Sequence, residues 1–376
     1  ARVPTFVTLQ GTFTYPGQKS NLTRNVDGAG WAWDKAPCSD GLLAVWGSTS
    51  SAVFAAGNDG VILRHDGRRW RSLDSGTGAN LRALWGFGEE MVFAAGDDGV
   101  ILRHDGKRWR RTPSGTTNTL TALWGNSTRN LWAVGLAGTV LRFDGQAWQP
   151  VPSPTKQDLH AIWGTDAGNM YVAGASGVLA RFTGRSWQLK DTKVTATLRA
   201  IWGGSASDFY VAGDEATLLR TDGEAFRVLE PPTTRDLHAL WGRGPRDVYA
   251  AGEHGTILHF DGARWSAQDA VNGQHIAALW GTGAVVHGVI SQPPERMKLT
   301  HRVELPAYAP PTVADPGFAE RVVVPMTARA RELLGYSNFV GRVGVTQRPD
   351  KGGPTTVWMG SDEAPVELTF FKHSLK

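Results

Sequence analysis

A short apolar run ending in Trp-Gly recurs along the chain at a constant spacing of 39 residues. The first copy, LLAVWG, covers residues 42–47, and every later copy keeps the spacing. The tryptophans of these pairs are Trp46, Trp85, Trp124, Trp163, Trp202, Trp241 and Trp280. Repetition at a fixed period of this length is typical of proteins built from one repeated supersecondary unit. The sequence therefore predicts an array of seven copies of a single unit.

A second motif, Asp-Gly-x-x-Trp, follows the same period. It ends at Trp70, Trp109, Trp148, Trp187, Phe226 and Trp265, with Thr183 in place of one aspartate. One period before Trp70 lies Trp31, in VDGAGW at 26–31, so a further box precedes the first Trp-Gly pair. The box aspartates are Asp27, Asp66, Asp105, Asp144, Asp222 and Asp261. The array thus begins with the second half of a unit and ends with the first half of one.

One unit, residues 81–119, contains four candidate strands. LRALW, MVFAAG and GVILRHD are apolar or alternating runs, and Trp109 opens a fourth. The second and third runs are joined by Gly96-Asp97-Asp98-Gly99, whose aspartates tolerate the positive φ that tight hairpins need. The box joins the third strand to the fourth, because an Asp side chain can hydrogen-bond to its own backbone in such a turn.

Four antiparallel strands per unit, repeated seven times, predict an all-β fold: a seven-bladed β-propeller. A solenoid and two stacked sandwiches are the alternatives. The circular offset favours the propeller, since only a closed ring gains from dividing one blade between the two ends of the array. The closing blade is expected to take its outer strands from about 22–36 and its inner strands from about 276–290, which removes the free edges of a linear array.

The domain prediction has three parts. Residues 1–20 form a strand segment, residues 21–292 form the propeller, and residues 293–376 form a small, mostly β module. The module begins after a proline-rich stretch and contains strand-like runs at 297–305, 321–326, 339–346, 355–360 and 366–371, with one short helix at 327–334. The strand at 6–15 is expected to pair with this module.

Composition excludes several classes of function. No run approaches the 18 or so apolar residues of a membrane helix. The net charge of +4 is small for this length and the Lys and Arg residues are spread over all blades, so nucleic-acid binding is not indicated. Cys38 is the single cysteine and the ten histidines show no metal-ligand spacing, so neither metal nor cofactor is expected. The chain begins at Ala1 without a signal peptide, which fits a processed exported protein or a shortened sequence.

The repeated tryptophans are interpreted mainly as core. Burying one Trp removes about 150–250 Å² from water, which contributes roughly 4–6 kcal/mol at about 25 cal/mol per Å². An aromatic cage for a ligand is the alternative. Function is therefore sought at positions that the repeat leaves variable, and the second residue of the inner strand is the clearest. Around the ring it is Leu43, Arg82, Thr121, His160, Arg199, His238 and Ala277.

Arg82, His160, Arg199 and His238 are the candidate ligand-binding residues at the mouth of the channel. We expect an anionic small ligand there, tuned by protonation of either histidine; a solvated polar lining is the alternative. The hairpin turns on this face are acidic, at Asp59, Asp97, Asp98, Asp214, Glu215 and Glu253. The opposite face carries Arg68, Arg69, Lys107, Arg108, Arg185, Arg243 and Arg264. These charged residues either lie in solvated turns without a binding role or form docking surfaces for a charged partner.

A further arginine recurs just before the boxes. It is found at Arg64, Arg103, Arg142, Arg181 and Arg220. Its recurrence on successive blades indicates a structural role between blades and not a single site.

The boxes RHDGRRW, RHDGKRW, RFDGQAW and HFDGARW resemble the Asp-box repeats of sialidases and of non-enzymatic bacterial propellers. The whole unit, over about 22–290, is similar to repeats of exported bacterial propellers and more distantly to photosystem assembly-factor propellers. The catalytic set of sialidases does not transfer, because Tyr171, Tyr210 and Tyr249 share one repeat position that is typical of packing. No other catalytic motif is found.

The sequence therefore predicts a non-catalytic binding or assembly propeller that contacts a protein partner in an exported or surface complex. A carbohydrate-binding lectin with repeated blade sites is the alternative, and a hydrolase acting at the channel mouth is the third possibility.

Overall fold

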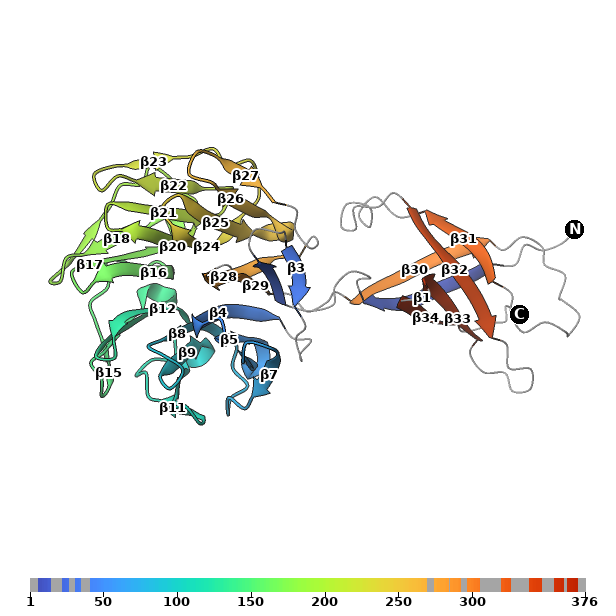
Figure 1. Ribbon diagram of the computed structural model, residues 1–376, viewed down its shortest axis with the longest axis horizontal. Coiled ribbons are helices and arrows are strands. Elements are labelled where there is room, and N and C mark those ends of the chain that lie inside the picture. The colour runs from blue at the N-terminus through green and yellow to red at the C-terminus, as the bar shows by residue number, and fades with distance from the viewer. Residues whose placement is uncertain are drawn as a thin grey trace, which may run out of the picture. The chain divides into compact units, whose positions relative to one another are not determined.

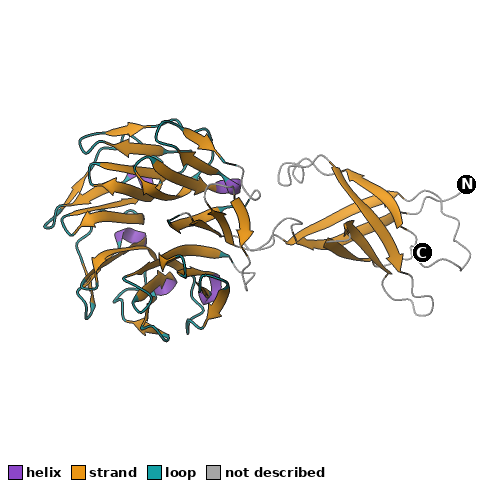
Figure 2. Ribbon diagram, in the orientation of Figure 1, coloured by secondary structure: helices purple, strands orange, loops and turns teal. Residues whose placement is uncertain are grey.

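The computed structural model describes residues 6–14, 22–26, 31–34, 41–268, 274–283, 285–291, 296–304, 319–325, 338–346, 355–361 and 364–370. These residues form strands, turns and five short 3₁₀ turns, without an α-helix among them (Figure 2). The chain divides into two units, Lys19–Pro293 and Ala1–Gln18 with Pro294–Lys376.

The larger unit is a seven-bladed propeller of four-stranded antiparallel sheets (Figure 1). We number the blades 1 to 7 by their inner strands, β4 (Leu42–Thr49), β8 (Leu81–Gly86), β12 (Leu120–Ser127), β16 (Leu159–Asp166), β20 (Leu198–Ser205), β24 (Leu237–Gly244) and β28 (Ile276–Thr282). The second strands are β5 (Ala52–Gly57), β9 (Val92–Gly96), β13 (Asn130–Gly135), β17 (Asn169–Gly174), β21 (Asp208–Gly213), β25 (Asp247–Gly252) and β29 (Val285–Ile290).

The third and outer strands complete the blades. The third strands are β6 (Ile62–His65), β10 (Ile101–His104), β14 (Val140–Phe143), β18 (Leu179–Phe182), β22 (Leu218–Thr221), β26 (Ile257–Phe260) and β2 (Leu22–Val26). The outer strands are β7 (Trp70–Leu73), β11 (Trp109–Thr112), β15 (Trp148–Pro150), β19 (Trp187–Leu189), β23 (Phe226–Val228), β27 (Trp265–Ala267) and β3 (Trp31–Asp34).

Blade 7 is built from both ends of the array, as the circular offset predicts. Its strand order is β28-β29-β2-β3, and β2 pairs antiparallel with β29 through Leu22↔Val289 to Val26↔Val285. Inner strand β28 neighbours β4 just as β4 neighbours β8, so the ring is closed. Leu22 is fully buried in one cluster with Leu42 of blade 1, and hydrophobic packing therefore continues across the seam.

The second strands are short and rich in alanine because each lies between two neighbouring blades. All six residues of β5, AVFAAG, are buried. A strand covered on both faces reads as a continuous apolar run instead of an alternating one. This explains why the second strands of the repeat show no alternation.

The turns between second and third strands use left-handed backbone, as the Asp-rich turn sequences predict. Asp59 and Asp98 have φ of 52° and 55°, and each precedes a glycine that also has positive φ. Blade 5 departs from this pattern, because Glu215 and Ala216 have φ of 56° and 55°. An alanine there occupies a conformation that costs L-residues roughly 1–2 kcal/mol.

The Trp-Gly pairs link successive blades. A Cβ added to Gly86 would lie 2.5 Å from Cη2 of Trp46, on the preceding blade. The same approach is 2.6 Å between Gly242 and Trp202, and 2.6 Å between Gly47 and Trp280 across the seam. At these three junctions, and at Gly281 beneath Trp241, a tryptophan ring covers the glycine of the next blade, and no side chain fits beneath that ring. At Gly125, Gly164 and Gly203 the nearest atoms belong to other residues.

We expect Gly242→Ala to destabilise the propeller by about 1–3 kcal/mol, the usual cost of overpacking a close contact. The new methyl group would meet the Trp202 ring and also the Asp247 carbonyl oxygen, at 2.7 Å. Urea unfolding measures the loss. Gly244→Ala in the same strand is the matched control, since nothing lies within 4 Å of its Cβ position, and it should stay within about 0.5 kcal/mol of the parent. Equal stability of both variants would contradict the covering role of Trp202.

The smaller unit contains six described strands. β1 (Phe6–Thr14) pairs antiparallel with β30 (Arg296–Glu304) along its whole length, from Phe6↔Glu304 to Thr14↔Arg296. The other four form an antiparallel sheet in sequence order, β31 (Ala319–Pro325), β32 (Asn338–Thr346), β33 (Thr355–Ser361) and β34 (Ala364–Phe370). The helix predicted at 327–334 lies outside the described residues.

Candidate functional site

A central channel of about 510 Å³ runs along the inner strands of all seven blades. Each inner strand contributes its second to fifth residues to the lining. The second residue is the position that varies between blades, and the fifth is the tryptophan of the Trp-Gly pair. The channel is therefore polar near the hairpin turns and aromatic toward the other end.

No helix in the described parts of the chain is long and apolar enough to cross a membrane.

The structure brings the four residues predicted for the channel mouth into one ring. We call this ring the rim, and it consists of Leu43, Arg82, Thr121, His160, Arg199, His238 and Ala277. Because each rim residue is the second residue of an inner strand, the fold places it at the same height on each blade. Their role in ligand binding stays a prediction.

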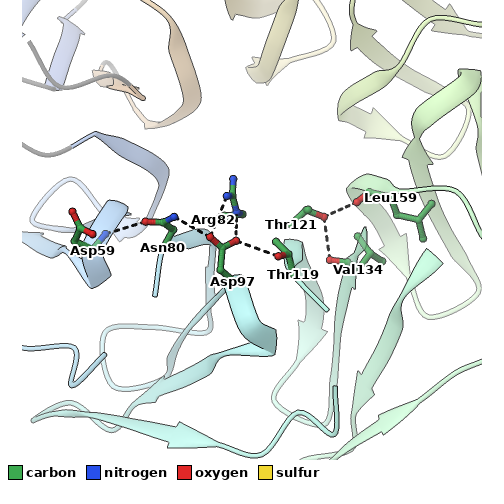
Figure 3. Close-up of polar contacts among 8 residues, drawn as sticks. All are labelled: Asp59, Asn80, Arg82, Asp97, Thr119, Thr121, Val134 and Leu159. Carbon is green, nitrogen blue, oxygen red and sulfur yellow. Dashed lines mark hydrogen bonds and ion pairs between the residues drawn. The ribbon is translucent and has the colours of Figure 1, made fainter. Parts of the chain in front are cut away.

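Arg82 is held by an ion pair within its own blade (Figure 3). Its Nε lies 2.5 Å from Oδ1 of Asp97, and its Nη2 lies 3.2 Å from Oδ2. Asn80 Nδ2 donates to Asp97 Oδ2 at 2.9 Å, and Thr119 of blade 3 donates to Oδ1 at 3.3 Å. The hydrogen bond from the Arg82 guanidinium lowers the pKa of Asp97, with a smaller contribution from Asn80, and together they outweigh burial, which acts to raise it.

Arg199 repeats this arrangement in blade 5. Its Nη2 donates to Asp214 Oδ2 at 2.9 Å, and its Nε contacts Oδ1. The hydrogen bond to Asp214 is the main reason that the pKa of Arg199 is raised. Both rim arginines therefore have a carboxylate partner, which weakens the case for an anionic ligand at this mouth.

The rim histidines are neutral near pH 7. Burial, followed by the charge of Arg199, lowers the pKa of His160 below its ordinary value. His238 has a lowered pKa for the same two reasons, with His275 as a third. Protonation of these rings is thus disfavoured, and the rim does not gain positive charge from them at neutral pH.

A polar link joins neighbouring blades at the mouth, through a residue that sequence reasoning did not single out. It is the residue just before each inner strand: Gly41, Asn80, Thr119, Asp158, Thr197, Asp236 and His275. Asp158 Oδ1 accepts the backbone N–H of Ala137 in the preceding blade at 2.8 Å, and Asp236 Oδ1 accepts that of Glu215 at 2.8 Å. This pre-strand residue differs from blade to blade although its spacing is constant, and that variation could have identified it in the sequence.

On the face that carries the channel mouth, carboxylates outnumber basic residues when the ion pairs Arg82–Asp97 and Arg199–Asp214 are left out of the comparison. The turns and pre-strand positions add Asp59, Asp98, Asp158, Glu215, Asp236 and Glu253. The loops that lead into the inner strands add acidic Asp74, Asp191 and Glu230 and basic Lys156, Lys190, Lys193 and Arg235. The described residues of this face therefore carry net negative charge, in agreement with the acidic turns noted in the sequence.

The tryptophans divide between core and channel. The box residues Trp31, Trp70, Trp109 and Trp148 are 5–8% exposed, in agreement with the core interpretation. The Trp-Gly tryptophans all line the channel, and of these only Trp46 and Trp124 are buried. The other box residues, Trp187, Phe226 and Trp265, are partly buried and pack against the core clusters. The core interpretation therefore holds for four boxes and is incomplete for the other three and for the Trp-Gly tryptophans, which border the channel.

The box aspartates stabilise turns. Asp66 Oδ1 accepts the backbone N–H groups of Arg68 and Arg69, both at 3.0 Å. These two hydrogen bonds, that of Arg69 first, lower the pKa of Asp66 to about 2. The same pair of bonds forms at Asp105, Asp144, Asp222 and Asp261. Asp27 lies outside the described residues.

The arginine before each box acts mainly inside its own blade. Arg220 pairs with Asp208 on the adjacent strand, at 2.9 Å, and its Cζ lies 5.1 Å from the ring centre of Tyr210. Arg142 lies 5.6 Å over the Trp132 ring in the same way. Two described copies also reach the next blade: Arg64 forms an ion pair with Glu89 of blade 2, and the Arg220 Cζ lies 5.9 Å over the Phe260 ring of blade 6. The structural role is confirmed, but its location between blades was wrong for most copies.

Solved structures resemble this chain in fold. A structure described as YCF48 bound to D1 peptide covers 73% of this chain and 98% of its own, with 12% identity and a TM-score of 0.57. YCF48 from Cyanidioschyzon merolae covers 70% and 99%, with 15% identity and a TM-score of 0.58. The WD40 propeller domain of Doa1 covers 70% and 96%, with 12% identity and a TM-score of 0.56.

No protein family model matches the chain, and no curated protein matches it in sequence. At 12–15% identity the structural likeness shows the propeller fold alone.

Proposed function

We propose that the chain is a non-catalytic protein-binding propeller that accepts a Lys- or Arg-bearing segment of a partner at the rim. The observation that carries this proposal is the excess of carboxylates around an open channel whose own arginines are already paired. A positively charged segment gains from this potential, and an anionic one does not.

The carboxylates around the rim are preorganised for binding. Asp97 and Asp214 are fixed by arginines, and Asp158 and Asp236 are fixed by backbone N–H groups of the preceding blade. Side chains held in place before binding lose little entropy when a partner arrives. A propeller of similar fold is described as bound to a peptide, which supports a peptide-like segment as the ligand.

Peptide display tests this proposal. A library of unbiased peptides selected on the full chain should return sequences rich in Lys and Arg, and their affinity should fall with salt because the attraction is electrostatic. Glu215→Lys combined with Glu253→Lys should weaken binding at least tenfold. Glu224→Lys, a charge reversal in a box turn on the opposite face, is the matched control and should change little.

Selection of acidic or charge-neutral peptides, or equal binding by the Glu215→Lys/Glu253→Lys variant and its control, would contradict the proposal. A glycan array supplies the competing outcome, since multivalent sugar binding would favour the lectin alternative. The setting of an exported or surface complex is likewise proposed, on the resemblance of the repeat to exported propellers. Fractionation of the source cells tests it.

A further inference from the structure

At the mouth, three repeat positions converge wherever one blade meets the next. They are the first turn residue of one blade, and the pre-strand and rim residues of the following blade. Thr119 bonds to Asp97 in this way between blades 2 and 3, and Glu253 lies 3.8 Å from His275 between blades 6 and 7. The fold brings these positions together, but it does not dictate which residues occupy them.

Between blades 5 and 6 all three positions carry metal-ligating groups. They are Asp214, Asp236 and His238, and one donor atom from each lies within 4.8 Å of the others. The corresponding residues are Asn58, Asn80 and Arg82 between blades 1 and 2, and Leu136, Asp158 and His160 between blades 3 and 4. We infer that Asp214, Asp236 and His238 form a binding site for a divalent transition-metal ion of the zinc class.

The donor set suits such an ion. Zinc takes imidazole nitrogen at about 2.0–2.1 Å and carboxylate oxygen at about 2.0–2.2 Å, commonly with three protein ligands and water. Donor atoms on one tetrahedral ion are then about 3.4 Å apart, so the three side chains must close by about 1 Å. All three are half-buried at the channel mouth, and the closure is a small adjustment of side chains that their partners already hold near one another.

The existing partners of the two carboxylates orient them and leave coordination sites. Arg199 bonds to Asp214, and the Glu215 N–H bonds to Asp236 Oδ1. A carboxylate offers about four lone-pair positions, so each retains oxygen lone pairs for an ion. Partners of this kind commonly fix the ligands of metal sites. Arg199 offsets one of the two negative charges, and Glu253 adds another nearby charge, which a divalent cation would balance.

His238 packs against a second imidazole. Its ring stacks on His275 at 6.2 Å with an interplanar angle of 14°, and His254 lies 5.2 Å from His275. Contact with a second imidazole holds the His238 ring in place. The sequence did not predict this site, because its ligands come from two blades and not from one local spacing.

Titration of the full chain with zinc chloride in chelator-free buffer, followed by calorimetry, tests the inference. One tight site per chain is expected. His238→Ala and Asp236→Asn should each weaken it at least tenfold, with circular dichroism verifying the fold of each variant without metal. Cobalt(II) provides a second readout, since its visible absorption band should be lost in both variants.

His160→Ala is the matched control. His160 occupies the same rim position and follows Asp158, but Leu136 replaces the third ligand, so its loss should leave zinc affinity within twofold of the parent. The inference is overturned if the parent binds no zinc, if His160→Ala weakens binding as much as His238→Ala does, or if His238→Ala and Asp236→Asn retain the parent affinity. A tight site that depends on His254 or His275 but not on His238 overturns it too.

Discussion

Deleting residues 1–36 is expected to abolish the cooperative folding of the propeller. The deletion removes β2 and β3, two of the four strands of blade 7, and leaves the edge of β29 unpaired. It also removes Leu22 from the cluster that joins the seam to blade 1. Exposed edges of this kind favour aggregation, and the ring can no longer close. Thermal unfolding and size-exclusion chromatography measure the effect.

Deleting residues 1–18 is the matched control. This shorter deletion removes β1 but leaves β2 and β3, because the propeller unit is Lys19–Pro293. The propeller should then keep a cooperative unfolding transition. A folded, monomeric protein after the longer deletion would show that closure of blade 7 is not needed for stability.

The repeat could be predicted from the sequence because its determinants are local. Hairpin turns, box aspartates and apolar runs each act within a few residues, so periodicity alone predicted seven blades and the seam between β2 and β29. The turn geometry at Asp59 and Asp98 followed in the same way. Such features recur at every copy, and repetition strengthens a signal that one copy would leave weak.

Interactions between blades were less predictable. The Trp-Gly motif was interpreted as core, whereas several of its glycines, such as Gly86 and Gly242, lie beneath the tryptophan of the preceding blade, 40 residues earlier. The rim arginines were interpreted as free for an anion, although Asp97 and Asp214 pair with them. A sequence signal existed, since the two blades with a rim arginine are the blades with Asp 15 residues later. It becomes meaningful only when the strands are placed side by side.

The last prediction concerns Trp132, which is among the largest fully buried side chains described. Its Nε1 donates to Asn130 Oδ1 at 3.0 Å, and the Arg142 Cζ lies 5.6 Å from its ring. On blade 4, the Trp187 ring meets it edge-on at 6.4 Å. We expect Trp132→Ala to lower the free energy of unfolding by about 3–5 kcal/mol, because it opens a large cavity between blades 3 and 4.

The Trp132→Phe variant separates the aromatic packing of Trp132 from its hydrogen bond to Asn130, because phenylalanine keeps a ring but has no N–H group. Phe54 and Phe93 occupy the same repeat position, and Arg103 lies 5.9 Å over the Phe93 ring, so this environment accepts a phenyl group with its arginine. The phenylalanine variant should therefore cost clearly less than the alanine variant in urea unfolding. If both variants lost the same stability, the hydrogen bond to Asn130 within blade 3, and not aromatic packing against blade 4, would account for the stability that Trp132 provides. The repeat would then tolerate Phe at this position only where a blade lacks an Asn130 equivalent, as blades 1 and 2 do with Ala52 and Met91.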